Sequence, residues 1–498
     1  MSLIQQSILV SLIAKREILN RATVVFFLLS LMAGEIMAQH HESDYIPPTE
    51  PEVLKKLDAW QDLKFGLLMH WGPYSQWGVV ESWSICDEDW ITRDKGRFEN
   101  YADYKEDYEN LQKTFNPARF APKKWVKAAR AAGMKYMVFT TKHHDGFSMF
   151  DTKQTDYRIT SKACPFHTHP EADITKALFQ AFRSEGFWVG AYFSKPDWHC
   201  KDYWWPYHST PDRHVNYDPA RHPEKWQSYK DFTFAQIEEL MTGYGPVDIL
   251  WLDGAWVRPV ENMPEEFKDW AMKKNYNQDV DMPRIVAMAR KHQPGLIVVD
   301  RWVSSEFENY LTPEQKIPDE ALTVPWESCI TMAPGWSYHA DHKYKPVRQL
   351  IHMLADIVCK GGNFLLNIGP SPEGDWDGQA YDRLEGIGKW MEVNHEAIYA
   401  TRPLPPYKDG KICLTRRKDG SIFAIYLAEE GENRPPSELL LHSIHPAPGS
   451  TLTLLGSSEE PLEWQWHAET GSVAILIPES MRASPPCEHA WTIRISAP

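Results

Sequence analysis

Short apolar runs alternate with helical segments along most of this chain, and this alternation constrains the fold more than any other feature. The run from Asp248 to Trp256 holds five large apolar residues and follows the turn residues Gly243 to Pro246, which is typical of a buried parallel strand. Similar runs occupy 64–72, 136–147, 187–194, 295–302 and 363–369. Because strand and helix alternate about seven times, we expect an α/β fold with a parallel sheet closed into a (β/α)8-like TIM barrel. No G-x-G-x-x-G follows a strand run, which weakens the alternative of an open, dinucleotide-binding sheet.

We expect the chain to divide into a leader and two domains. The predicted barrel spans residues 39–400, with a long helical pattern at 224–241 and a final one at 383–399. Near Thr401 the pattern changes to short β-type runs separated by Gly, Pro and Asn. This change predicts a C-terminal β-sandwich domain over 404–498.

The N-terminus has the order of a secretory leader. Lys15, Arg16 and Arg21 precede an apolar run at 22–33, and the small residue Ala38 comes before a polar stretch. This order predicts a signal peptide at 1–38 and export to the periplasm or out of the cell. The apolar run is short for a membrane span, so we expect no stable membrane insertion, with a retained anchor as the alternative.

Charge and composition narrow the class of ligand. The formal net charge is -15, which argues against nucleic acid and acidic polymers because phosphates and other anions would be repelled. The 22 tryptophans suit a protein that stacks indole rings on the apolar face of a neutral sugar. The seven cysteines include no C-x-x-C pair, so a zinc cluster is not indicated.

Polar side chains stand at the ends of several strand runs. Since strand ends meet around one pocket in a barrel, we expect these side chains to share a site. Taken singly, each has an ordinary structural interpretation, such as a histidine satisfied in the core or an aspartate that caps a helix. The residues are His70, His143, His144, Tyr192, Asp253 and Arg301.

Three chemistries use residues of these types. A metal site would combine His70, His143 and Asp253, but their spacing matches no local metal-binding motif. A serine nucleophile would need a G-x-S-x-G turn, which is absent. Glycoside hydrolysis needs one ionised and one protonated carboxyl group. Asp253 is the candidate for the first, and Glu327 or Glu81, each near Trp and apolar residues that would raise its pKa, for the second. An ordinary loop carboxylate is the alternative interpretation of both glutamates.

Several motifs, in collinear order, carry a resemblance to a known family. Together they resemble the retaining alpha-L-fucosidase family of glycoside hydrolases over about residues 50–400, and that family also carries a C-terminal β-domain. The His-His-Asp-Gly-Phe block is the most specific of them. The motifs are Lys64-Phe-Gly with His70-Trp-Gly72, Thr141-Lys-His-His-Asp-Gly-Phe147, Trp251-Leu-Asp-Gly254, Asp300-Arg-Trp302, and Trp326-Glu-Ser-Cys329 with Gly335-Trp-Ser-Tyr338.

The resemblance implies a role for each site residue. Asp253 is the implied nucleophile, and Glu327, in its Trp-Glu-x-Cys setting, is the expected acid/base. Glu81 is the alternative acid/base, although Ser82 separates it from Trp83 where the family has an acidic residue next to Trp. The implied substrate-binding residues are His70, Trp83, His143, His144, Tyr192, Arg301 and Trp336.

We therefore predict an exported, exo-acting alpha-L-fucosidase that hydrolyses terminal fucosyl linkages with retention, by double displacement. The expected partner is a fucosylated oligosaccharide or glycoconjugate, and no metal or other cofactor is expected. The competing hypotheses are a metal-dependent barrel hydrolase and a catalytically silent fucose-binding protein.

Overall fold

A computed structural model describes residues 42–88, 90–91, 93, 100–208, 212–262, 277–458 and 460–497. The predicted signal peptide at 1–38 lies outside the described residues. Residues 42–44 form a short 3-10 helix, η1, in a unit separate from residues 45–498. Among the described helices, none combines the length and apolar character that crossing a bilayer requires.

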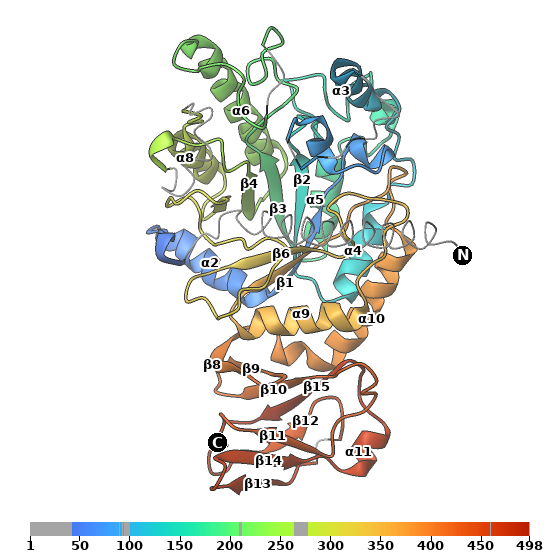
Figure 1. The fold of residues 1–498 in the computed structure, drawn as a ribbon, viewed down its shortest axis with the longest axis vertical. Helices are drawn as coiled ribbons and strands as arrows, with labels where there is room; N and C mark the ends of the chain where they lie inside the picture. Colours follow the sequence, from blue (N-terminus) through green and yellow to red (C-terminus); the bar gives the residue numbers. More distant parts are fainter. Residues whose placement is uncertain are drawn as a thin grey trace, which may run out of the picture. The chain divides into compact units, whose positions relative to one another are not determined.

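A seven-stranded sheet carries the N-terminal part of the fold (Figure 1). Each neighbouring pair of strands is parallel, and the order across the sheet is β5-β4-β3-β2-β1-β7-β6. Every residue of β1 and β2 is buried, as expected for a parallel sheet covered on both faces. The strands are β1 (Phe65–Met69), β2 (Tyr136–Lys142), β3 (Trp188–Ser194), β4 (Ile249–Asp253), β5 (Ile297–Asp300), β6 (Glu327–Thr331) and β7 (Asn363–Asn367).

The predicted parallel sheet is confirmed, but in the described residues its strands do not close into the expected eight-stranded barrel. The segment 308–314 contacts both β5 and β6, the two edge strands of the sheet. Its residues make isolated bridges, from Glu308 to Val299 of β5, from Leu311 to Trp326 just before β6, and from Glu314 to Cys329 of β6. Pro313 gives the physical reason for part of this irregularity, because proline has no N–H to donate to a ladder.

Helices α4, α5, α6, α8, α9 and α10 cover the outer face of the sheet, whereas Trp60 of α2 packs in the core on its inner face (Figure 1). Pro122 lies in the first turn of α4, and the Asp173 carboxylate caps α5 by accepting the N–H of Lys176 at 3.1 Å. The predicted final helix at 383–399 starts earlier and ends in a 3-10 turn, η8 (His395–Ala397). The helices are α2 (Pro51–Leu63), α3 (Tyr101–Asn110), α4 (Pro122–Ala131), α5 (Ile174–Ser184), α6 (Pro223–Gly243), α8 (Met282–His292), α9 (Val347–Cys359) and α10 (Gly378–Asn394).

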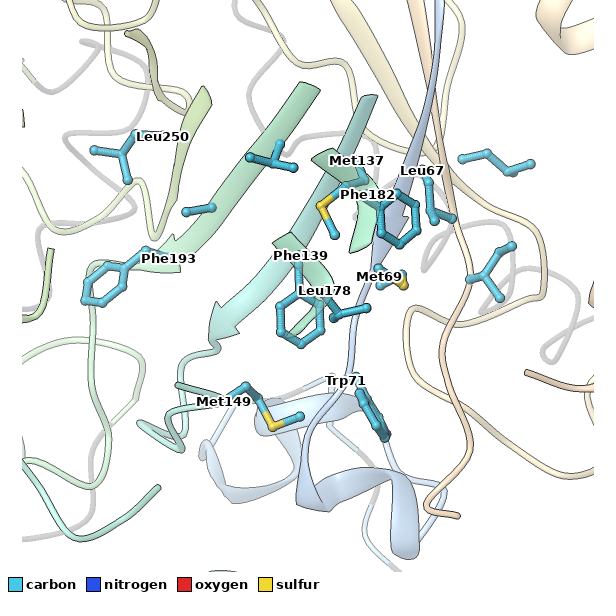
Figure 2. Close-up of a cluster of buried hydrophobic side chains, with 14 of the residues drawn as sticks. Leu67, Met69, Trp71, Met137, Phe139, Met149, Leu178, Phe182, Phe193 and Leu250 are labelled. Atoms are coloured by element: carbon cyan, nitrogen blue, oxygen red, sulfur yellow. The ribbon is translucent and has the colours of Figure 1, made fainter. Parts of the chain in front are cut away.

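Strand alternation separates two cores. Leu67 and Phe139 point toward the helices, where Figure 2 shows them on the same side as Leu178 of α5. The alternate residues, such as Leu68 and Trp251, form a second core on the inner face of the curled sheet. Side chains on the inner face therefore approach one another at the ends of the strands, and the site forms there.

The C-terminal part consists of antiparallel sheets. One has the order β12-β15-β10-β9-β8 and the other the order β11-β14-β13, and both contribute to one apolar core. Trp464 packs against this core, whereas Trp466 stays 38% exposed and stacks on His445. The elements are β8 (Thr401–Asp409), β9 (Ile412–Arg417), β10 (Ile422–Leu427), β11 (Glu438–Leu441), β12 (Leu452–Leu454), β13 (Trp464–His467), β14 (Ser472–Leu476), α11 (Glu479–Ala483) and β15 (Ala490–Ile495).

Candidate active site

Asp253 ends β4 and is the centre of the site. The Tyr192 hydroxyl donates to its Oδ2 at 2.6 Å, while Arg301 NH1 at 3.2 Å and the backbone N–H of Gly254 at 2.8 Å donate to Oδ1. Burial alone would raise the pKa of Asp253, but the Arg301 charge, His144 and the Tyr192 hydrogen bond outweigh it and hold the pKa below its usual range. Asp253 is therefore an ionised carboxylate, and 16% of its side chain remains exposed.

Gly254 makes this arrangement possible. Its φ is +93°, and a Cβ there would lie 2.2 Å from Cδ of Pro196. Only glycine combines that conformation with so close an approach. The chain can therefore turn away directly after Asp253 and leave the carboxylate facing the site.

The ring of His70 is held in one orientation. The Asn367 amide donates its NH2 to the carbonyl of Trp336 at 2.8 Å, which leaves Asn367 Oδ1 as the acceptor for His70 Nδ1 at 2.9 Å. Burial lowers the pKa of His70 to about 4. A neutral His70 thus carries its proton on Nδ1 and keeps Nε2 as an acceptor.

His143 and His144 follow β2, and both reach the site because the strand has ended at Lys142. His143 Nδ1 lies 2.6 Å from the Ser82 hydroxyl, and the His144 Nε2 lies 3.7 Å from Asp253 Oδ2. Burial lowers the pKa of His144 to about 4 and that of His143 well below its usual value. These two histidines are therefore neutral hydrogen-bonding groups at neutral pH.

Aromatic rings surround the polar centre. Trp336 lies 4.9 Å from the ring of His70, and Trp83 lies 5.3 Å from that of His144. The Tyr192 ring stacks on Trp251 at 5.2 Å. The structure thus brings Asp253 together with all seven residues predicted to bind the substrate.

Glu327 lies away from Asp253, at the other end of the sheet. It begins β6 and pairs in register with Asn363, the first residue of β7, so it is at the opposite end of the strands from Asp253. Its carboxylate accepts from the Tyr136 hydroxyl at 2.6 Å and from Trp251 Nε1 and the Tyr310 hydroxyl at 3.3 Å each. The residue is 0% exposed. A general acid must reach the glycosidic oxygen, and this position does not support the acid/base role expected of Glu327.

Glu81 and Glu314 are the glutamates nearer the site. Glu81 is 2% exposed, and its Oε1 accepts the backbone N–H of Ser337 at 2.8 Å. Burial raises the pKa of Glu81 to about 7, and the charge of Glu314 acts in the same direction. Glu314 is bridged to Asp253 by one guanidinium, since Arg301 NH2 donates to Glu314 Oε2 and NH1 to Asp253. Its side chain is 29% exposed.

The same site offers a group of metal-ligand types. His143, His144 and Asp253 each present one ligand atom, and these atoms lie within 4.8 Å of one another. Asp253 is already paired with Arg301, however, and a cation placed there would be repelled by the guanidinium. His143 Nδ1 is also engaged by Ser82. The donor set therefore suits hydrogen bonding to a neutral ligand better than a metal ion.

Comparison with known proteins identifies the family. The sequence profile of the Alpha-L-fucosidase family matches residues 32–396, which is more than half of the chain. The chain belongs to the alpha-L-fucosidase family. As a member, it is a glycoside hydrolase, and the family resemblance of its motifs is confirmed.

Relatives match this fucosidase-family chain over nearly its whole length. Human tissue alpha-L-fucosidase is 28% identical, with 95% of this chain and 96% of that protein aligned. The alpha-L-fucosidase of Branchiostoma floridae is 26% identical over 93% of this chain and 98% of its own. The structure of alpha-L-fucosidase isoenzyme 1 from Paenibacillus thiaminolyticus superposes with a TM-score of 0.69 at 28% identity, covering 89% of this chain and 99% of that one.

Sequence reasoning missed several residues of this fucosidase-family site. Asn367 lies within the run predicted as a strand at 363–369 and ends β7, so its polar position could have been noticed. Glu314 lies in a loop, Ser82 lies in the short 3-10 helix η3 (Glu81–Ile85), and Trp256 follows Asp253 by three positions; none of them belongs to a periodic pattern. For these three residues, only tertiary contacts reveal a role.

Proposed function

We propose that this family member hydrolyses terminal α-L-fucosyl linkages with retention, with Asp253 as the nucleophile. The observation that carries the proposal is the ionised Asp253, held by Tyr192, Arg301 and a backbone N–H among neutral histidines. Such a carboxylate is suited to attack an anomeric carbon with oxocarbenium character. The neutral rings of His70 and His143 are suited to bind sugar hydroxyls.

Oδ2 of Asp253 is the oxygen that forms the new bond in this proposal. Oδ1 already accepts two hydrogen bonds, from Arg301 and Gly254, whereas Oδ2 accepts one, from Tyr192. In the first step Oδ2 bonds to the anomeric carbon, the glycosidic C–O bond breaks, and the leaving oxygen takes a proton from an acid. In the second step water attacks, its proton goes to the same residue, and the ester is cleaved.

We propose Glu314 as that acid/base, in place of Glu327. Three observations support Glu314: it shares Arg301 with Asp253, it retains exposed surface, and it lies near Glu81. While Asp253 is ionised, both carboxyl groups share the Arg301 charge. When Asp253 becomes an ester, Arg301 keeps Glu314 as its carboxylate partner. Glu81 stays the alternative.

Azide rescue of alanine variants separates these roles. We expect Asp253→Ala to lose at least about a thousandfold in turnover and to form β-fucosyl azide, the inverted product. We expect Glu314→Ala to keep more activity on an activated aryl fucoside than on a glycan, and to form α-fucosyl azide. If azide rescues Glu81→Ala instead, the acid/base role belongs to Glu81. Wild-type turnover in Asp253→Ala would contradict the nucleophile assignment.

We also propose a domain arrangement and a cellular location for this protein. We propose that 1–38 is a signal peptide for export, that 39–400 is the catalytic domain and that 404–498 is a β-sandwich domain. We further propose that the sheet is an incomplete (β/α)8 barrel in which the segment 308–314 fills the eighth place; its bridges to β5 and β6 support this. N-terminal sequencing of the exported protein tests the cleavage after Ala38.

A further inference from the structure

A row of aromatic rings leads away from the nucleophile. His144 lies beside Asp253, the ring of Trp83 lies 5.3 Å from that of His144, and the ring of Trp90 lies 5.3 Å from that of Trp83. Trp83 also contacts Trp256 at 5.6 Å. Two ring contacts therefore join Trp90 to His144, which lies beside Asp253.

The inner part of this row is held rigidly. Arg213 is 5% exposed, and its guanidinium lies 4.9 Å from the ring of Trp83 and 5.2 Å from that of Trp256. Its Nε donates to Glu88 Oε1 at 2.8 Å, and its backbone N–H to the same oxygen at 3.2 Å. Glu88 and Trp90 belong to the same loop. The rings are thus ordered before any ligand binds, which lowers the entropy cost of binding.

Trp90 itself is not a core residue. It is 53% exposed, whereas Trp198, which contacts the same Trp83 at 5.2 Å, is 0% exposed. An indole with half its surface in water, at the outer end of an ordered row, has a face available to a ligand. Indole faces carry partial negative charge and attract C–H groups. The apolar face of a sugar ring presents such groups.

We propose that Trp90 forms a leaving-group subsite, in which its indole stacks on a neutral sugar that follows the fucose in the substrate. This inference rests on the proposed fucosidase activity and names the class of substrate. The net charge of -15 disfavours anionic sugars and sulfated glycans at this position. The protein thus favours fucosylated neutral oligosaccharides over fucosides with small or alkyl leaving groups.

The test compares leaving groups rather than total activity. kcat/KM is measured on a neutral fucosyl-trisaccharide, 4-nitrophenyl fucoside and octyl fucoside, for the wild type, Trp90→Ala and Trp90→Phe. We expect the trisaccharide-to-aryl ratio to fall roughly tenfold in Trp90→Ala and to recover in part in Trp90→Phe, which keeps a stacking ring. Trp466→Ala, a matched change at the exposed tryptophan of β13, is expected to keep the wild-type ratio.

The outcomes are distinguishable. An unchanged ratio in Trp90→Ala overturns the subsite while leaving the fucosidase activity intact. An equal loss on octyl fucoside and on the trisaccharide shows a general apolar surface and also overturns the sugar subsite. Failure of the wild type to cleave any of the three substrates contradicts the proposed function instead.

Discussion

Glu327→Gln is the substitution that most directly tests the placement of Glu327 in the inner core. Its carboxyl group is surrounded by three donors and has no exposed surface. Glutamine keeps the shape and one acceptor oxygen, and the Tyr136 hydroxyl can rotate to meet the new amide. The variant therefore removes the ionisable proton while it changes little in packing.

The expected change in the free energy of unfolding follows from the linkage between protonation and folding. Burial raises the pKa of Glu327 from 4.5 to about 7 in the folded chain. As the pH rises from 4.5 to 7, the unfolded chain releases this proton before the folded chain does, so the stability that protonated Glu327 contributes is lost across this interval. The shift corresponds to about 3 kcal/mol of unfolding free energy. Glutamine cannot ionise and avoids this loss.

We therefore expect the two proteins to melt together near pH 5 and to separate near pH 8.5. Glu327→Gln is then the more stable, with a Tm higher by on the order of 5 °C. Calorimetry across this pH range provides the measurement, and Glu392→Gln, at an exposed glutamate of α10, is the matched control that should melt like the wild type. The variant should also retain most of its turnover.

Two results would refute this reasoning. Parallel melting curves at every pH would show that Glu327 has no raised pKa. A folded Glu327→Gln protein with turnover lowered a thousandfold would show that Glu327 takes part in catalysis. It would contradict the assignment of Glu327 to the inner core.

Two further predictions concern the nucleophile. Tyr192→Phe removes the hydrogen bond at 2.6 Å to Asp253; we expect kcat/KM to fall roughly 10- to 100-fold and the acid limb of the pH–rate profile to move to higher pH, because the pKa of Asp253 rises without this donor. An unmoved acid limb would separate Tyr192 from the ionisation of Asp253. Dialysis against a chelator should leave turnover on an aryl fucoside unchanged, since Arg301 already neutralises Asp253; loss of turnover that a divalent ion restores would support the metal-dependent alternative.

The sequence alone determined where the buried strands lie and which polar residues end them, because both depend on neighbours along the chain. The apolar run before Asp253 predicts a buried strand and places the carboxylate at its end, and His70 and Tyr192 follow from the same pattern. The sequence also predicts a raised pKa for Glu327; in the structure, burial in the inner core raises it to about 7, although the neighbouring Trp326 packs on the helix side of the sheet.

Only the tertiary structure decided at which end of the sheet each carboxylate lies. Glu327 and Asp253 both belong to strands, but one begins its strand and the other ends it, and this separation depends on strand register rather than on local composition. Glu314 lies in an irregular loop, and it approaches Asp253 because both contact Arg301. Trp83, Trp90 and Trp256 likewise come together through folding. Burial and strand placement are local properties that a sequence pattern carries, whereas contacts between loops depend on packing across the whole sheet.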